Sequence, residues 1–258
     1  MKTLSKIYMA LVLMFLYVPI FVLIVFSFNE TKSRSVFSGF TLEWYAKLFR
    51  NEVIISSLVN TIIIAVTASI AATVLGTLAA IGINSMRKFP KAVVMNITNM
   101  PIVNPEIVTG VSLMLLFVFF AARMNLEFGF VTLVIAHITF DVPYVVLSVL
   151  PKLKQMNRFT YEAALDLGAT PGYALWHVLI PECKQGIVTG ALLAFTLSLD
   201  DFTISYFTTS PLVQNLSTLI YSATKLGISP VYYALSSLMF VVLLVLLMIV
   251  NHRTADNN

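Results

Sequence analysis

Residues 161–181 read YEAALDLGATPGYALWHVLIP, a stretch with the start and stop signals of two short helices joined by a sharp turn. Good helix formers fill residues 162–167, and Gly168 follows them where a left-handed residue costs least as glycine. Thr170 can cap a second helix, with Pro171 in its first turn. We expect this second helix to be short and to end before Pro181. An element with this many signals is interpreted as a docking site for another protein.

The surrounding sequence has the composition of a membrane protein. Hydrophobic residues make up 59% of the 258 residues and charged residues only 11%, whereas soluble domains average about 45–50% and about 25%. The net charge is +4, but the basic residues form short clusters between apolar runs, which does not favour nucleic-acid binding. The single cysteine, Cys183, excludes an internal disulfide, and no Cys/His spacing resembles a metal site.

Six apolar runs are long enough to cross a bilayer, which takes about 20 residues. They lie at approximately residues 7–28, 56–83, 92–122, 128–150, 186–207 and 231–250. Pro101 and Pro105 interrupt the third run, which we expect to be one kinked span. The first run is too long for a signal peptide and is expected to stay uncleaved. The sequence therefore predicts a single all-α transmembrane domain over residues 1–258, with six helices and a long loop at 151–185.

Positive charge gives the orientation of these spans. With both termini in the cytoplasm, ten of the sixteen Lys and Arg residues lie on the inner side, including the cluster Arg87, Lys88 and Lys91. The loop at 151–185 is then cytoplasmic. The outer loop at 29–55 is expected to hold a short interfacial helix, with Trp44 and Tyr45 at headgroup level.

Small residues in the second predicted span indicate a close helix contact. They are Ala68, Ala71, Ala72, Gly76, Ala79 and Ala80. Packing inside this chain and packing against a second subunit are equally compatible with the pattern.

The inner loop resembles the EAA signature of ABC importer permeases, which reads Glu-Ala-Ala, three residues, Gly, nine residues, Ile, one residue, Leu-Pro. The matching positions are Glu162, Ala163, Ala164, Gly168, Val178, Ile180 and Pro181. Valine replaces isoleucine at 178 and isoleucine replaces leucine at 180, so both positions stay aliphatic. The resemblance implies a type I permease fold in which this loop is a coupling helix seated on an ATPase subunit.

Nearly the whole chain is similar to spermidine/putrescine permeases of the PotC type, notably at 17–20, 27–29, 137–140 and 195–202. This similarity implies a bacterial inner-membrane complex with a PotB-like second permease, a PotA-like ATPase dimer and a PotD-like external binding protein. The chain has no phosphate-binding loop of its own. It is therefore expected to be a transport subunit without an ATPase site or cofactor, and the partner ATPase would bind ATP and Mg²⁺.

Four acidic residues fall inside predicted spans: Glu106, Asp141, Asp200 and Asp201. A charge at the bilayer centre costs about 2.5–3.5 kcal/mol, so such residues usually face a protein interior or a water-filled path. No Lys or Arg lies deep in the same spans, and we interpret the four acids as a candidate path for a cationic polyamine. Structural alternatives stay open. One acid of the Asp200/Asp201 pair could bond a backbone amide near a helix break or a residue of the partner permease. Asp141 could serve a local kink or pair with His137, one turn away, where a structural hydrogen bond is favoured over a proton relay.

Other function classes fit the sequence less well. A proton- or sodium-coupled secondary transporter would use intramembrane acids directly, but such proteins usually show inverted repeats, and none is visible. A membrane-embedded enzyme would need a cluster of catalytic groups at one depth, and only His137 and Asp141 come near it. An ABC permease for another organic cation is the alternative within the favoured class.

Overall fold

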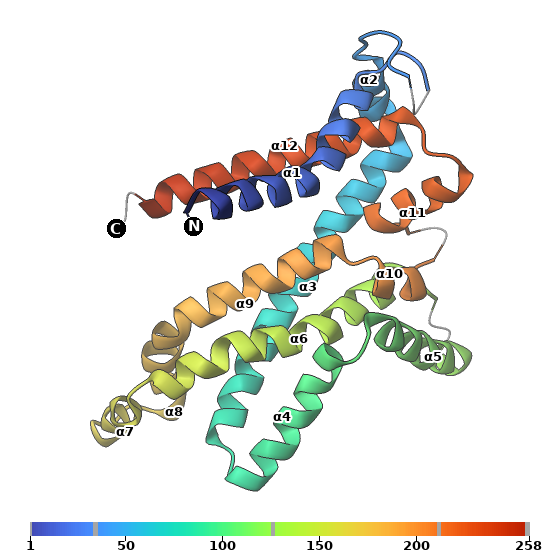
Figure 1. Cartoon of the computed structure of the whole chain (residues 1–258). Coiled ribbons are helices and arrows are strands. Elements are labelled where there is room, and N and C mark those ends of the chain that lie inside the picture. Colours follow the sequence, from blue (N-terminus) through green and yellow to red (C-terminus); the bar gives the residue numbers. More distant parts are fainter. Residues whose placement is uncertain (1, 33–35, 125–126, 211–212, 256–258) are drawn as a thin grey trace. The chain divides into compact units, whose positions relative to one another are not determined.

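The structure is a computed structural model that describes residues 2–32, 36–124, 127–210 and 213–255 (Figure 1). It does not describe the side chains of residues 2–4, 124, 158, 226, 243 and 245–255. The chain forms two compact units, Met1–Ser56 with Ile220–Asn258, and Ser57–Leu219. The described residues are nearly all helical, which confirms the all-α fold; the expected single domain stays a prediction.

Five helices in the described part are long and apolar enough to cross a membrane. They are Ser5–Ser27 within α1 (Lys2–Ser27), α3 (Glu52–Ser85), Glu106–Arg123 within α5 (Glu106–Met124), α6 (Phe130–Gln155) and the stretch Pro171–Asp200. The sixth expected span, 231–250, lies in α12 (Pro230–Ala255), where the described apolar stretch is Pro230–Val242 and most later side chains lie outside the described residues. A six-span arrangement is compatible with these helices.

The third predicted span, 92–122, is wrong as one kinked helix. The chain forms two helices there, α4 (Lys88–Val103) and α5, which are separated at Asn104 and Pro105. Asn104 is extended, with ψ 144°. A proline ring clashes with a helical residue before it, so the break falls at Asn104. Pro101 stays inside α4, and only α5 is long and apolar enough to span.

The fifth predicted span, 186–207, has the wrong ends. Helix α9 (Ile180–Asp200) begins six residues earlier and stops at Asp200. Asp201 leaves the helical conformation, with ψ 119°, and a separate short helix follows, α10 (Thr203–Thr208). Since α6 also continues to Gln155, the non-spanning loop is shorter than the predicted 151–185.

In the first unit, α1 and α12 run side by side, and α2 (Glu43–Arg50) packs on α12 (Figure 1). Trp44 is buried and its indole Nε1 donates a hydrogen bond of 2.7 Å to the carbonyl of Asn29. The Tyr45 hydroxyl is 2.8 Å from Ser27 Oγ. A short helix at this position is confirmed, and Trp44 anchors the loop through its bond to Asn29. The headgroup depth of Trp44 and Tyr45 stays a prediction.

In the second unit, α6 and α9 lie side by side and pack with α3 around a core of small and branched residues (Figure 1). A Cβ added at Gly76 of α3 would lie 2.6 Å from Val145 Cβ of α6, and one added at Gly186 of α9 would lie 2.8 Å from the Ser148 carbonyl oxygen. Ala68, Ala72 and Ala80 are fully buried. The small-residue face of α3 therefore packs within this chain.

Candidate functional site

Residues 157–181 form the EAA elbow, whose first half is helix α7 (Arg158–Asp166). The Asn157 side chain starts this helix by accepting a hydrogen bond of 3.1 Å from the Phe159 amide. The amides of Gly168 and Ala169 end it by donating to the carbonyls of Leu165 and Ala164, at 2.9 and 3.0 Å. This pair of bonds is a Schellman motif, and Gly168 has the left-handed φ of +89° that the motif requires. The predicted helix end at Gly168 is confirmed.

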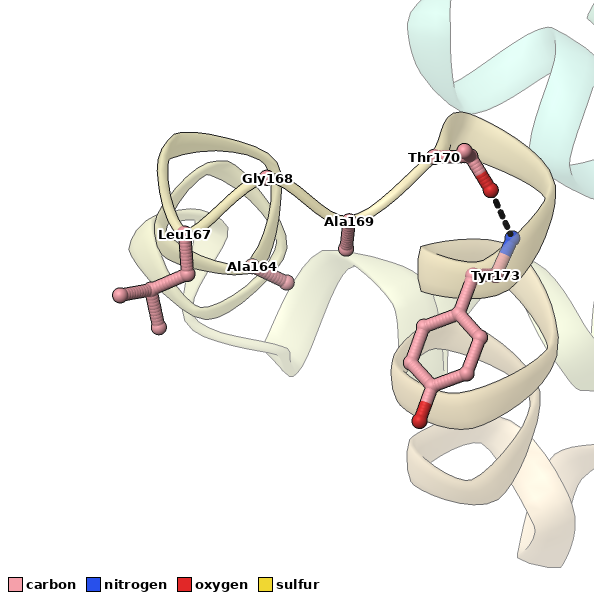
Figure 2. A pocket seen from close by; sticks show the side chains of 6 residues that line it. All are labelled: Ala164, Leu167, Gly168, Ala169, Thr170 and Tyr173. Carbon is pink, nitrogen blue, oxygen red and sulfur yellow. Dashed lines mark hydrogen bonds between the residues drawn. The ribbon is translucent and has the colours of Figure 1, made fainter.

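The second half of the elbow begins as predicted. Thr170 Oγ1 accepts a hydrogen bond of 3.4 Å from the Tyr173 amide (Figure 2), and Pro171 opens helix α8 (Pro171–Ala174). Two capped helices thus meet at an extended turn of two residues, Ala169 and Thr170.

The prediction that the second helix ends before Pro181 is wrong. The helix continues through a π-helical segment, Leu175–Leu179, directly into α9. The Ile180 amide donates to the carbonyl of Leu175, five residues back. Proline has no N–H to bond the carbonyl four residues before it, and a wider turn of this kind absorbs the missing bond. One helical rod therefore runs from the elbow to Asp200.

The seven motif residues occupy both halves of the elbow. Glu162, Ala163, Gly168 and Pro181 are exposed, and Ala164, Val178 and Ile180 are half-buried. Among and beside the motif residues, Leu179 and Cys183 join the core of α3 and α6, and Tyr161 and Leu175 pack against it. The elbow is thus anchored to the spanning helices while its outer surface stays free in this chain.

That outer surface carries large apolar side chains. Leu167 is 90% exposed, Trp176 66% and Tyr173 57%. Ala164, Leu167, Gly168, Ala169, Thr170 and Tyr173 line a hollow of about 570 Å³, and Leu167 points away from Tyr173 across it (Figure 2). These exposed apolar side chains form a candidate interaction surface.

The structure separates the four intramembrane acids into two kinds. Glu106 and Asp200 are exposed, and each stands at a helix break, Glu106 at the start of α5 and Asp200 at the end of α9. Within the described residues neither forms a hydrogen bond or an ion pair. These two carboxylates are free to meet a cation.

Asp201 and Asp141 are buried and bonded. Asp201 accepts hydrogen bonds from the amides of Ile204 (3.2 Å) and Ser205 (2.8 Å), so it starts helix α10. This is the backbone-amide alternative for the Asp200/Asp201 pair. Asp141 Oδ2 accepts a bond of 2.7 Å from Ser198, and its Oδ1 has no partner in the described part.

His137 does not bond Asp141 directly, because Ser198 lies between them. His137 Nδ1 is 3.1 Å from Ser198 Oγ, and Nε2 is 2.9 Å from Ser205 Oγ and 3.7 Å from Asp201 Oδ2. The expected direct pairing is therefore corrected to a bridged one.

Three residues of this buried cluster were missed by sequence reasoning: Ser198, Ser205 and Asn215. Asn215 Nδ2 donates to Ser205 Oγ at 2.7 Å. Serine and asparagine are common in membrane helices, and their distance in sequence from His137 hides the contact. The one available signal in the sequence was the three-residue spacing of Ser198 and Asp201 in the segment 195–202, which suggests that their side chains lie near each other.

Comparisons with known proteins assign most of the chain, including the elbow residues, to one family. Residues 72–254 match the family described as "Binding-protein-dependent transport system inner membrane component". The chain is 37% identical to the putrescine transport system permease protein PotI of Escherichia coli strain K12, over 87% of this chain and 81% of that protein. It is 34% identical to the spermidine/putrescine permease protein PotC of Haemophilus influenzae, over 97% of this chain and 96% of that one.

Solved structures show the same fold at lower identity. A bacterial ABC transporter involved in alginate import matches with a TM-score of 0.75 and 13% identity, covering 97% of this chain and 95% of that chain. The MetNI methionine ABC transporter matches with a TM-score of 0.57 and 16% identity, covering 80% of this chain and 98% of that chain.

Proposed function

The chain belongs to the family of binding-protein-dependent transport system inner membrane components, the permease subunits of ABC importers, and on that premise we propose that it forms half of a translocation pore for polyamines. As a permease it is a transport subunit rather than an enzyme, and ATP is hydrolysed by a separate subunit. Family membership also favours this class over a proton- or sodium-coupled transporter.

The EAA elbow supports a role in energy coupling. Its Schellman turn fixes the angle between α7 and the following helix, and its apolar side chains Leu167 and Trp176 are largely exposed. We propose that this surface seats on a cytoplasmic, PotA-like ATPase dimer that binds ATP and Mg²⁺. Glu162, Ala163, Ala164, Gly168, Val178, Ile180 and Pro181 would shape that contact.

The remaining partners follow from the relatives. We propose a PotB-like second permease that supplies the other half of the pore and a PotD-like external protein that delivers the substrate. The complex would sit in the bacterial inner membrane with both termini of this chain in the cytoplasm.

A polyamine substrate is supported by the names of the two relatives and by the two free carboxylates. Glu106 and Asp200 are exposed at helix breaks and have no hydrogen bond or ion pair among the described residues. A polyamine has two or more ammonium groups that could bind them in turn. Asp141 and Asp201 are buried and hydrogen-bonded, so we assign them a structural role next to the proposed path. An importer for another organic cation would use the same two groups.

Uptake of labelled putrescine and spermidine by the reconstituted complex tests this function. Asp200→Asn and Glu106→Gln should each lower uptake about tenfold or more, since an ionic hydrogen bond is worth about 1.5–3 kcal/mol. Both variants should insert and assemble normally, because both side chains are exposed. Wild-type complex that moves neither polyamine but moves another organic cation would refute the substrate assignment. Undiminished uptake by the double variant would remove both acids from the path.

A further inference from the structure

A chain of hydrogen bonds runs through the buried centre of the second unit. Asn215 Nδ2 donates to Ser205 Oγ (2.7 Å), and Ser198 Oγ donates to Asp141 Oδ2 (2.7 Å). His137 joins the two pairs, with Nδ1 3.1 Å from Ser198 Oγ and Nε2 2.9 Å from Ser205 Oγ. All five side chains are at least 98% buried.

The bond directions are consistent along the whole chain. Because the Ser198 hydroxyl donates to Asp141, its oxygen must accept from Nδ1–H of His137. A neutral imidazole with its proton on Nδ1 has an accepting Nε2, which takes the hydroxyl proton of Ser205. The Ser205 oxygen is then free to accept from Asn215. The donors and acceptors of the four bonds therefore match, although Asp141 Oδ1 has no partner in the described part. Removing one link leaves a further buried polar group unpaired.

This chain crosses the helix break at Asp201. His137 and Asp141 belong to α6, and Ser198 belongs to the last turn of α9. Ser205 lies in α10, and Asn215 caps the start of α11 (Leu216–Leu226), where its Oδ1 accepts from the Thr218 amide at 3.0 Å. His137 is thus bonded to both sides of the break.

The α9 side of the break is continuous with the EAA elbow. The helical stretch Pro171–Asp200 has 30 residues, which is about 45 Å at 1.5 Å per residue. Gly186 and Gly190 let α9 pack directly on the backbone of α6, so the two helices are held as a pair. A displacement at the elbow therefore reaches Ser198 and His137 at the far end.

We propose that His137 is a positioning residue for transport. It links the α6–α9 pair to α10 and the start of α11, so that movement of the elbow shifts the turn that holds Asp200. This role rests on the proposed coupling function of the elbow, and it does not depend on which cation is carried.

The test compares uptake per ATP hydrolysed by the complete complex, reconstituted in liposomes with its ATPase, second permease and binding protein. His137→Asn can retain the bond on the Nδ1 side but does not reach Ser205, and Ser205→Ala removes the same link from the other side. Each should lower uptake per ATP about tenfold, the equivalent of about 1.4 kcal/mol, while ATP hydrolysis continues. Thr77→Val is the matched control, because the Thr77 hydroxyl is buried in this unit and has no hydrogen-bond partner among the residues that the structure describes.

The double variant separates linkage from general damage. If His137 acts through Ser205, His137→Asn with Ser205→Ala should be no worse than Ser205→Ala alone. Both changes break the bond between His137 and Ser205, and only Ser205→Ala also removes the acceptor of Asn215 Nδ2. Additive losses, or an equal fall in uptake and ATP hydrolysis, would overturn the proposal. If His137→Asn does not assemble, the smaller change Ser205→Ala decides alone: an unchanged ratio refutes the proposal. If the wild-type complex transports no polyamine, the substrate assignment is refuted. Uptake per ATP hydrolysed can then still be measured with the cation that the complex does carry, so the role of His137 is tested separately.

Discussion

At the scale of single residues, Gly168 is the position on which the elbow's angle depends. Its φ is +89°, and a Cβ added there would meet nothing within 4 Å. Gly168→Ala therefore acts through backbone strain alone, which costs about 1–2 kcal/mol for a left-handed residue. We expect uptake to fall about fivefold or more, the effect of a destabilisation of about 1 kcal/mol, with normal membrane insertion.

Gly172→Ala is the matched control for Gly168→Ala. A Cβ at Gly172 also meets nothing within 4 Å, but Gly172 lies in helix α8 without a positive φ. Alanine is the better helix former, so this variant should keep full uptake. Equal losses in both variants would show that the elbow is sensitive to any added side chain, and the strain explanation would fail.

Asp201 and Asp200 should differ in their effect on stability although they are neighbours. Asp201→Ala removes the acceptor of two amides at the start of α10, and loss of a helix cap costs about 0.5–2 kcal/mol. Asp200 is exposed, so Asp200→Ala should change stability by no more than about 0.5 kcal/mol. Thermal unfolding of the complex in detergent measures both variants. A larger loss for Asp200 than for Asp201 would contradict the assignment of the cap.

At this scale, the sequence predicted the features that depend on neighbouring residues. Gly168 and Thr170 were predicted because a helix end and a cap depend on residues within one turn. The contact of His137 with Ser198 and Ser205 was not, because it joins residues 61 and 68 positions apart. Their side chains meet only after α6, α9 and α10 have packed.

At the scale of elements, close packing of α3, α6 and α9 depends on glycines. A Cβ at Gly76 would lie 2.6 Å from Val145 Cβ, and one at Gly186 would lie 2.8 Å from the Ser148 carbonyl oxygen. Gly76→Ala and Gly186→Ala should each destabilise the complex by about 1–3 kcal/mol, the usual cost of overpacking. Thermal unfolding in detergent again gives the measurement.

Second-site changes distinguish these two contacts. Val145→Ala should partly restore Gly76→Ala, because the obstacle there is chiefly a side chain. No side-chain change should restore Gly186→Ala, because its nearest obstacle is backbone. Gly82→Ala, on α3 with open space around its Cβ position, should be neutral or stabilising. Destabilisation by Gly82→Ala as large as that by Gly76→Ala would refute the packing explanation.

The ends of the spanning helices show why elements were only partly predicted. Hydrophobicity located the apolar runs but not the breaks within them. The break at Asn104 has a local cause in Pro105, but the sequence alone does not distinguish a kink at a proline from a full break. Pro181 also predicts the end of a helix. The helix instead continues past it, because the π-helical segment Leu175–Leu179 accommodates the missing hydrogen bond. The end of α9 at Asp200 depends on the bonds that Asp201 makes to α10, which only the folded chain shows.

At the scale of the whole molecule, the elbow and the outer loop should lie on opposite sides of the membrane. Cys183 is the only cysteine, and it is buried. In a Cys183→Ser background, a cysteine introduced at one chosen position is therefore the only thiol that can react. Leu167 of the elbow is 90% exposed, and Val36 of the outer loop is also exposed. With both termini in the cytoplasm, Leu167→Cys should react with a membrane-impermeant maleimide only in inverted vesicles, and Val36→Cys only in right-side-out vesicles. Labelling of Leu167→Cys from outside would reverse the orientation.

The ATPase subunit should protect Leu167→Cys and leave Val36→Cys reactive, because an apolar side chain seated on a partner is closed to a water-soluble reagent. Equal labelling of Leu167→Cys with and without the ATPase would show that the elbow's apolar surface has another partner.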